Sequence, residues 1–527
     1  MNKDVKWPLL IFAIGVFMAA LDNGIMTSAL TTLTHAFGVT PTWGTWTMTL
    51  YTLGMAISVP IVGKFSDRYG RKRLFLIEIG LFGFGSLLVA LSPNFVSFLA
   101  ARFIQSLGGG GIFIIASSYV LSTFPKERQG RALGMIGGMH GIASVLGPNI
   151  GALILSLTGS WHWLFLINLP IAAILFALGT KHLQEGREQV ATRTDWIGIV
   201  ILTGAIFSFM YGVTTLDGGH VSNSLLAPSS LAWLGSGVLL FVALWRYDKR
   251  AARRAIDPIL PTDMLRGTAF RLTLLLGLFS GAILGAVIFI PGYVEQFLHV
   301  DAAMSGFWFT PLALAAGVGA AGGGHIIDWK GPIASLTAAA SSAVIGFALF
   351  PLWVEAPWQM VVASCFVGLG FGAMLGAPLN VLATERTERD KGIALATLSL
   401  ARQIGMAIAP TFYAGFLARS FVGIGTTVRE QLSANGRRPV PPQLLEQLSG
   451  ANDFQSLTQL LEKIPDPHVK AVLEGAIDTA VRQGFNGLFY AALTISILAF
   501  VTIGILARVR KKQGGQLAER TTTPRVT

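Results

Sequence analysis

The feature that most constrains this chain is a series of apolar runs of about 20 residues, each long enough as an α-helix to cross a hydrocarbon core of about 30 Å. Fourteen such runs lie between Trp7 and Leu506. Only 13% of the 527 residues are charged, against about 25% in soluble domains. Because a lipid-exposed backbone must satisfy its own polar groups, the runs predict helices. We expect an all-α integral membrane protein with fourteen transmembrane helices.

Lysine and arginine gather on alternate loops. If the N-terminus is cytoplasmic, the inner loops include the basic segments 64–73, 126–131, 181–193 and 246–271, whereas the short outer loops contain neither residue. Cytoplasmic loops are the ones enriched in these cations. The pattern predicts a multi-pass cell-membrane protein with both termini in the cytoplasm. It also accounts for the net charge of +12 without a nucleic-acid partner.

Two charged stretches divide the helices into a 6+2+6 plan. We predict an N-terminal six-helix bundle at 1–185 and a linker carrying two extra helices at 186–250. The first five helices of a C-terminal bundle follow at 251–420, then an extracellular loop at 421–484, and finally the last helix with a cytoplasmic tail at 485–527. Paired bundles of this kind are typical of secondary transporters, whose sites lie near the membrane midplane.

The outer loop is the largest extramembrane segment. Apolar residues between Val469 and Val481 recur at helical spacing, which predicts an amphipathic helix packed on the mouth or the headgroups. A flexible insert without function is the alternative, because "NGRRPVPP" (435–442) is typical of a loop. A periplasmic adaptor that binds this loop stays an open alternative.

Four segments carry a family resemblance: "GKFSDRYGRKR" (63–73), "ARFIQSLGGGG" (101–111), "GIASVLGPNIGA" (141–152) and "WHWLFLINLPIA" (161–172). The first is also what a basic cytoplasmic hairpin would contain. Together the segments resemble the major facilitator superfamily, and the fourteen helices resemble its drug:H⁺ antiporter branch. The resemblance implies two six-helix bundles plus two extra helices, and a transporter rather than an enzyme.

The resemblance also assigns roles. It implies a cytoplasmic gate made by Gly63, Asp67, Arg68, Gly70 and Arg71, and an antiporter motif with Gly141, Gly147, Pro148 and Gly151. The Gly-Pro pair is expected to bend its helix, although a bend that only serves packing is the alternative. A second copy of the gate, "GGHIIDWKGP" (323–332), keeps Asp328 but lacks the arginines. We therefore do not expect the second copy to have a gating role equal to that of the first.

Asp22 is a carboxylate inside the first apolar run. It follows Trp7 by 15 residues, which places it roughly 22 Å above the inner boundary, whereas Arg102 in the fourth run lies about 20 Å above it. A charge at such depth costs about 2.5–3.5 kcal/mol or more, so it is usually paired and functional. The shared depth predicts that the two residues form a pair.

We predict that Asp22 carries the coupled proton and that Arg102 is its partner, directly or through Gln105. A nearby guanidinium favours the carboxylate, whereas removal from water favours the neutral acid, so a change of conformation would exchange the proton. The released anion could then attract cationic cargo. An ion pair that only fixes helix packing is the alternative.

The expected substrate pocket lies between the bundles. Soft and flat side chains suited to amphiphiles are Met26, Tyr51, Phe113, Met139, Trp308 and Phe309, although these could equally be core residues. Arg402 lies near the midplane, where it would either bind an anionic or polar substrate group or brace its helix.

We therefore expect a monomeric proton antiporter that exports amphiphilic, often cationic, drugs and toxic compounds. Its partners are the substrate, protons and membrane lipids, and it needs no cofactor besides the proton gradient. A dedicated lipid or glycolipid exporter is the alternative, and a multi-helix enzyme or receptor is disfavoured because the sequence has no metal cluster or catalytic motif.

Overall fold

The computed structural model describes residues 3–185, 193–251, 256–259, 262–300, 306–387, 390–421 and 467–522, together with residues 424, 457, 460, 461 and 464. In this part of the chain thirteen helices are long and apolar enough to span a membrane, and the bent helix α7 adds a fourteenth if its two arms count as one span. The predicted all-α membrane fold is confirmed. One pair of two-residue strands, β1 (Arg193–Thr194) and β2 (Ile256–Asp257), is the exception.

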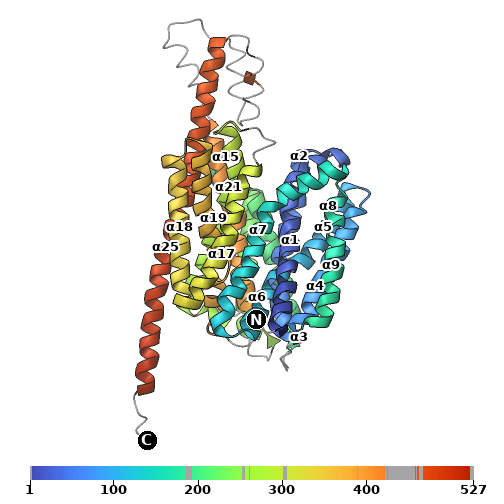
Figure 1. Cartoon of the computed structure of the whole chain (residues 1–527), viewed down its shortest axis with the longest axis vertical. Helices are drawn as coiled ribbons and strands as arrows, with labels where there is room; N and C mark the ends of the chain where they lie inside the picture. The colour runs from blue at the N-terminus through green and yellow to red at the C-terminus, as the bar shows by residue number, and fades with distance from the viewer. Residues whose placement is uncertain are drawn as a thin grey trace.

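The first half contains the helices that hold the candidate site, and in Figure 1 it runs from blue to cyan. Its elements are α1 (Lys3–Phe37), α2 (Pro41–Gly44), α3 (Trp46–Tyr69), α4 (Arg71–Ala90), α5 (Phe95–Gly110), α6 (Ile112–Thr123), α7 (Lys126–Thr158), α8 (Trp163–Leu166) and α9 (Asn168–His182). Helices α5 and α6 form one span, Phe95–Thr123, with a turn at Gly111. We call the end of the molecule at which α1 begins and the α3–α4 turn lies the N-terminal face.

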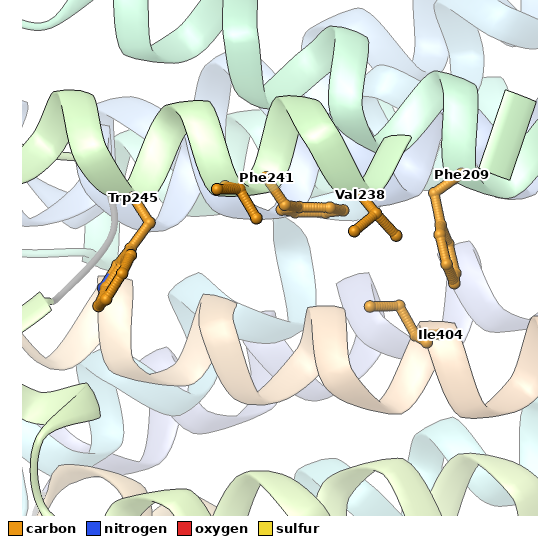
Figure 2. Close-up of a pocket in the computed structure, with 6 residues that line it drawn as sticks. Phe209, Val238, Phe241, Trp245 and Ile404 are labelled. Carbon is orange, nitrogen blue, oxygen red and sulfur yellow. The ribbon is translucent and has the colours of Figure 1, made fainter. Parts of the chain in front are cut away.

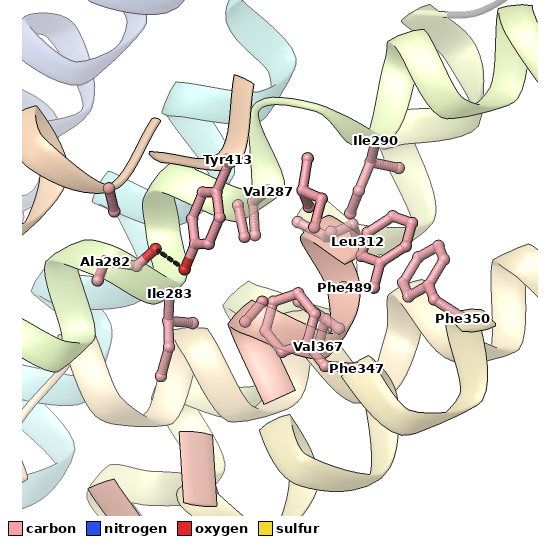
Figure 3. Close-up of a cluster of buried hydrophobic side chains, with 14 of the residues drawn as sticks. Ala282, Ile283, Val287, Ile290, Leu312, Phe347, Phe350, Val367, Tyr413 and Phe489 are labelled. Atoms are coloured by element: carbon pink, nitrogen blue, oxygen red, sulfur yellow. Dashed lines mark hydrogen bonds between the residues drawn. The ribbon is translucent and has the colours of Figure 1, made fainter. Parts of the chain in front are cut away.

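The second half lies beside the first (Figure 1). Its elements are α13 (Thr262–Leu265), α14 (Thr268–Val287), α15 (Ile290–Gln296), η2 (Gly306–Phe309), α17 (Thr310–Lys330), α18 (Pro332–Trp353), α19 (Pro357–Leu375), α20 (Pro378–Thr384), α21 (Lys391–Phe421) and α25 (Pro467–Thr522). Buried aliphatic and aromatic side chains fill it, and the Tyr413 hydroxyl donates to the Ala282 carbonyl within this core at 3.1 Å (Figure 3).

Between the halves the chain forms the predicted extra helices, α10 (Trp196–Thr214) and α12 (Pro228–Ala251), joined through α11 (Val221–Leu226). Helix α10 packs on α3 and α21, one from each half. The short strands β1 and β2 pair where the chain enters and leaves these helices. The predicted boundaries near 186 and 250 stay predictions, since residues 186–192 and 252–255 lie outside the described part.

The end of the chain differs from the prediction. The amphipathic stretch is not a separate helix but the beginning of α25, which runs without a break for 56 residues and projects beyond the bundle in Figure 1. Its apolar stripe, including Leu473, Ile477 and Val481, is buried in the core of the second half. That burial stabilises the extension. The segment 435–442 lies outside the described residues.

Candidate functional site

An ion pair connects α1 to α5 in the interior of the first half. Arg102 Nη1 donates to Asp22 Oδ2 at 2.6 Å, and the two residues are 0% and 1% exposed. The structure thus brings together the two charges that helix geometry placed at one depth. Isolated charges are costly in this setting, and each of these two supplies the other's compensation.

Neutral polar side chains complete the shell of Asp22. Gln105 Nε2 donates to Asp22 Oδ1 at 2.9 Å, and its Oε1 accepts from Arg102 at 2.6 Å. Asn168, the first residue of α9, donates a further bond to Asp22 Oδ1 at 2.8 Å. Ser86 of α4 accepts from Gln105 at 2.7 Å. The carboxylate on α1 therefore accepts from three side-chain donors, two on α5 and one on α9.

Sequence reasoning found Gln105 but missed Asn168 and Ser86. Both belong to apolar runs in which a single amide or hydroxyl changes hydropathy little. A signal existed for Asn168, which is the amide side chain inside the quoted segment "WHWLFLINLPIA".

Aromatic rings enclose the guanidinium of Arg102. Its Cζ lies 4.2 Å from the ring centroid of Tyr51 and 5.5 Å from that of Phe165. A cation over such a face is stabilised by about 0.5–2 kcal/mol. The Tyr51 hydroxyl has no hydrogen-bond partner among the described residues. The ring of Tyr51 thus belongs to the wall of the ion pair, whereas the prediction placed it in the substrate pocket.

The predicted antiporter motif contacts α1 next to Asp22. Helix α7 bends by 47° between Ser144 and Leu146, since Pro148 lacks an N–H and its ring crowds the carbonyl four residues earlier. At the bend Gly147 meets Gly24, and a Cβ on Gly147 would lie 2.5 Å from the Gly24 Cα.

The other two motif glycines have looser surroundings. A Cβ on Gly141 would lie 3.6 Å from the Ala316 side chain, which is an ordinary contact, and Gly151 is simply buried. The close approach between α1 and α7 therefore depends on Gly147 rather than on the motif as a whole.

The predicted gate joins the two halves at the N-terminal face. Asp67 Oδ2 accepts hydrogen bonds from the backbone N–H groups of Gly392 and Ile393 at 2.7 and 3.3 Å, in the first turn of α21. A carboxylate is favoured there by the helix dipole and the free N–H groups. Arg71 bonds to Asp67 at 3.2 Å and to Ser118 of α6 at 2.8 Å.

Glycines allow this contact to be close. A Cβ on Gly63 would lie 2.7 Å from the Gly392 carbonyl oxygen, and Gly70 has a φ of 97°, in the region that favours glycine. Arg68 lies 5.5 Å from the ring of its neighbour Tyr69 and is not part of the Asp67 contact.

Asp328 forms a similar contact, and the expectation that the second copy does not have an equal gating role stays a prediction. Its carboxylate accepts from the backbone N–H groups of Gly130 and Arg131 at 2.8 and 3.1 Å, near the beginning of α7. The Arg131 guanidinium lies 3.7 Å away and supplies the cation that the second copy lacks. Gly331, three residues after Asp328, has a φ of 85°, as Gly70 has after Asp67.

A small crevice lies between the halves where α6, α20 and α21 meet. It is too narrow to hold a water molecule and is lined by Phe113, Ile114, Ser117, Asn380, Leu395, Ser399 and Arg402. Asn380 bonds to Ser117 across the halves at 3.5 Å. We call this space the central crevice.

The other residues predicted for the pocket lie elsewhere. Met26 is fully buried in the first half, and Trp308 and Phe309 pack against the core of the second half. Met139 is half-buried on α7. Phe113 and Arg402 are thus the two predicted pocket residues that line the central crevice.

A second crevice, of about 350 Å³, lies between the extra helices and α21, on the other side of α21 (Figure 2). Its lining is entirely apolar: Phe209, Val238, Phe241, Val242, Trp245 and Ile404. Figure 2 shows Trp245, Phe241 and Val238 in succession along α12. We call this space the apolar crevice.

Two further observations bear on chemistry. Glu78 is buried, and its Oε2 accepts from the Gly111 backbone N–H at 2.9 Å, at the turn between α5 and α6. Among the described residues no group of three or more His, Cys, Asp or Glu side chains is arranged to hold a metal ion.

Comparisons with known proteins agree with this architecture. A sequence model of the Major Facilitator Superfamily matches residues 12–410. The uncharacterized MFS-type transporter YfiU of Bacillus subtilis (strain 168) is 52% identical over 512 residues, which cover 97% of this chain and 99% of that protein. Multidrug resistance protein 3 of the same organism is 27% identical over 533 residues and 98% of each chain.

A fungal protein and a solved structure are also similar. Efflux pump dotC of Dothistroma septosporum (strain NZE10 / CBS 128990) is 30% identical over 409 residues, which cover 76% of this chain and 69% of that protein. The crystal structure of the human organic anion transporter MFSD10 (TETRAN) has a TM-score of 0.53 at 14% identity, covering 94% of this chain and 100% of that one. At such identity the similarity concerns the fold alone.

Proposed function

Because this chain belongs to the major facilitator superfamily and is a transporter rather than an enzyme, we propose that it is a proton-coupled antiporter. It exports amphiphilic drugs or other toxic compounds by alternating access, as a member of the fourteen-helix drug:H⁺ branch. The efflux pump and multidrug resistance protein among its relatives support the direction and the kind of cargo.

The observation that carries the proposal is the buried Asp22–Arg102 pair. Asp22 is the titratable carboxylate of the site, it is removed from water, and its partner lies on another helix, 80 residues later in the chain. Movement of α5 relative to α1 would lengthen the pair and favour the neutral acid, whereas its closure favours the anion. At its bend α7 packs on Gly24, which is two residues after Asp22 in α1. Because α7 also faces the second half, this contact would link the proton exchange to the other half of the molecule.

In this proposal the N-terminal face lies in the cytoplasm, as the distribution of lysine and arginine predicts. The Asp67 and Asp328 contacts close that face, which supports an arrangement accessible from outside. A proton then reaches Asp22 from outside and leaves to the cytoplasm after the face has opened. Cargo moves in the opposite direction.

The test is export of a fluorescent amphiphile in everted membrane vesicles after a proton gradient is imposed. Asp22→Asn keeps the size of the side chain and one acceptor oxygen but cannot carry the proton. We expect gradient-driven export to fall to the background of empty vesicles while the variant is still inserted at normal levels. Asp263→Asn, at an exposed position in α13, is the matched control. Normal export by the Asp22 variant would refute the proposal.

The apolar crevice favours a lipid exporter as a second candidate. Its lining side chains are aliphatic or aromatic, and a row of them along α12 is a surface on which an acyl chain could pack (Figure 2). Val238→Trp and Ile404→Trp would fill it. If lipid is the cargo, both substitutions abolish export of a labelled lipid to the outer leaflet; if drugs are the cargo, they leave dye export unchanged.

A further inference from the structure

Arg402 is a buried cation without a matching anion. The residue is 8% exposed, and among the described residues no carboxylate lies within 4 Å of its guanidinium. Its Nε donates one bond of 3.2 Å to Ser280 of α14, and its Nη2 has no hydrogen-bond partner in the described part. A cation in the membrane interior is costly, so an unpartnered donor there is available to water or to a ligand.

The unpartnered donor belongs to a residue at a polar contact between the two halves. Arg402 lines the central crevice together with the polar side chains of Ser117, Asn380 and Ser399. Phe113 and Leu395 supply apolar surface beside them. A polar end with a cation and an apolar wall is the complement of an amphiphile whose head group is acidic.

The other charged side chains of the interior also favour an anionic cargo. Arg102 is neutralised by Asp22, and every oxygen of that carboxylate already accepts a hydrogen bond. Glu78 bonds to the α5–α6 turn and does not line the central crevice. The site between the halves therefore presents a cation and no carboxylate, which disfavours a cationic ligand.

We propose that the exported amphiphile carries an acidic group, a carboxylate, sulfonate or phosphate, which binds the Arg402 guanidinium in the central crevice. This inference rests on the proposed function and replaces the cationic cargo that the sequence favours. A free organic acid and an anionic lipid share this chemistry. A purely bracing role would need Arg402 to be satisfied by its own protein, whereas among the described residues it makes a single bond, to Ser280.

Binding to the purified full-length chain tests the proposal. We would measure the thermal midpoint with naphthylacetate, naphthylacetamide and naphthylethylamine, which share one aromatic body and differ in charge. The acid should raise the midpoint, and the amide and amine should not. Arg402→Gln should weaken binding of the acid about tenfold or more, and Arg402→Lys should keep part of it. Arg266→Gln, on an exposed arginine, is the matched control.

Lipid and soluble acid are separated by a second arm with short-chain phosphatidylglycerol and phosphatidylcholine. Stabilisation by phosphatidylglycerol alone would assign the acidic group to a lipid. If Arg402→Gln does not fold, Ser280→Ala keeps the cation but frees it from its brace, and acid binding should persist. Stabilisation by the amine, an acid effect that survives in Arg402→Gln, or no effect of any acid would overturn the inference.

Failure of this inference is distinct from failure of the proposed function. Amine export that moves protons through Asp22 and is unchanged in Arg402→Gln would contradict the inference and leave the antiporter intact. Acid binding at Arg402 without any proton movement would contradict the proposed antiporter and leave the inference about Arg402 intact.

Discussion

At the residue scale, the site is an ion pair held by its surroundings as much as by its own charges. Asp22 accepts bonds from Arg102, Gln105 and Asn168, and the ring of Tyr51 covers the guanidinium. Each contact restricts where the carboxylate can lie while it is charged. Loss of one contact should therefore change transport without unfolding the chain.

Asn168→Ala removes one donor from the carboxylate. A hydrogen bond to a charged group contributes about 1.5–3 kcal/mol, so we expect the initial rate of proton-driven export to fall about tenfold or more. Everted vesicles with equal amounts of inserted protein provide the measurement. Asn223→Ala, at an exposed position in α11, is the control, and equal rates for the two variants would contradict the assignment.

Two substitutions of Tyr51 distinguish the role of its ring from the role of its hydroxyl. Since the hydroxyl has no partner among the described residues, Tyr51→Phe should transport like the unchanged protein. Tyr51→Leu loses the cation–π contact, worth about 2 kcal/mol when desolvated, and should transport about tenfold more slowly. A defect in the Phe variant as large as in the Leu variant would show that the hydroxyl has the functional role.

At the scale of helices, two similar contacts join the two halves at the N-terminal face. Asp67 binds the beginning of α21, and Asp328 binds the beginning of α7, so each half contributes one carboxylate to a helix of the other. Both carboxylates accept hydrogen bonds from backbone N–H groups. Both positions should thus control how often the face opens.

Opening can be measured by labelling Ser399→Cys, in the central crevice, in a Cys365→Ser background. Loss of a helix-terminal hydrogen-bonding side chain costs about 1 kcal/mol, so Asp67→Ala or Asp328→Ala should each speed labelling in everted vesicles about fivefold. The contacts are separate, so the double variant should reach about thirtyfold. Asp263→Ala is the control, and a change for Asp67→Ala alone would limit the gate to one copy.

The bend of α7 gives a prediction within a single motif. Gly147→Ala places a methyl group 2.5 Å from the Gly24 Cα and must push α7 from α1, whereas Gly141→Ala makes an ordinary contact. We expect export to be lost in the first variant and kept in the second, with both chains inserted and monodisperse on size-exclusion chromatography. Equal tolerance of the two substitutions would contradict the role given to the α1–α7 contact.

The sequence predicts the spans and the depth of Asp22 and Arg102, because the rise of a helix per residue is fixed. It does not predict rotation about the helix axis, which packing decides, and so it missed that Asn168 donates to Asp22 and that Ser86 accepts from Gln105. The partners of Asp328 are 197 and 198 residues away, and no local pattern indicates them. The extension of α25 was missed because its stripe is buried against residues far earlier in the chain.

At the scale of the whole molecule, the ion pair lies inside one half and the central crevice lies between the two. The proposed coupling requires that a proton on Asp22 changes how the halves meet. Near its bend α7 contacts both halves, at Gly24 of α1 and at Thr310 of α17. The central claim is that one carboxylate exchanges its proton when cargo binds.

The most direct measurement is the number of protons released when a saturating amphiphile binds the purified protein in weakly buffered solution with a pH indicator. The account predicts release by the unchanged protein and none by Asp22→Asn, although the variant still binds the ligand by thermal stabilisation. Equal proton release from both proteins would contradict it.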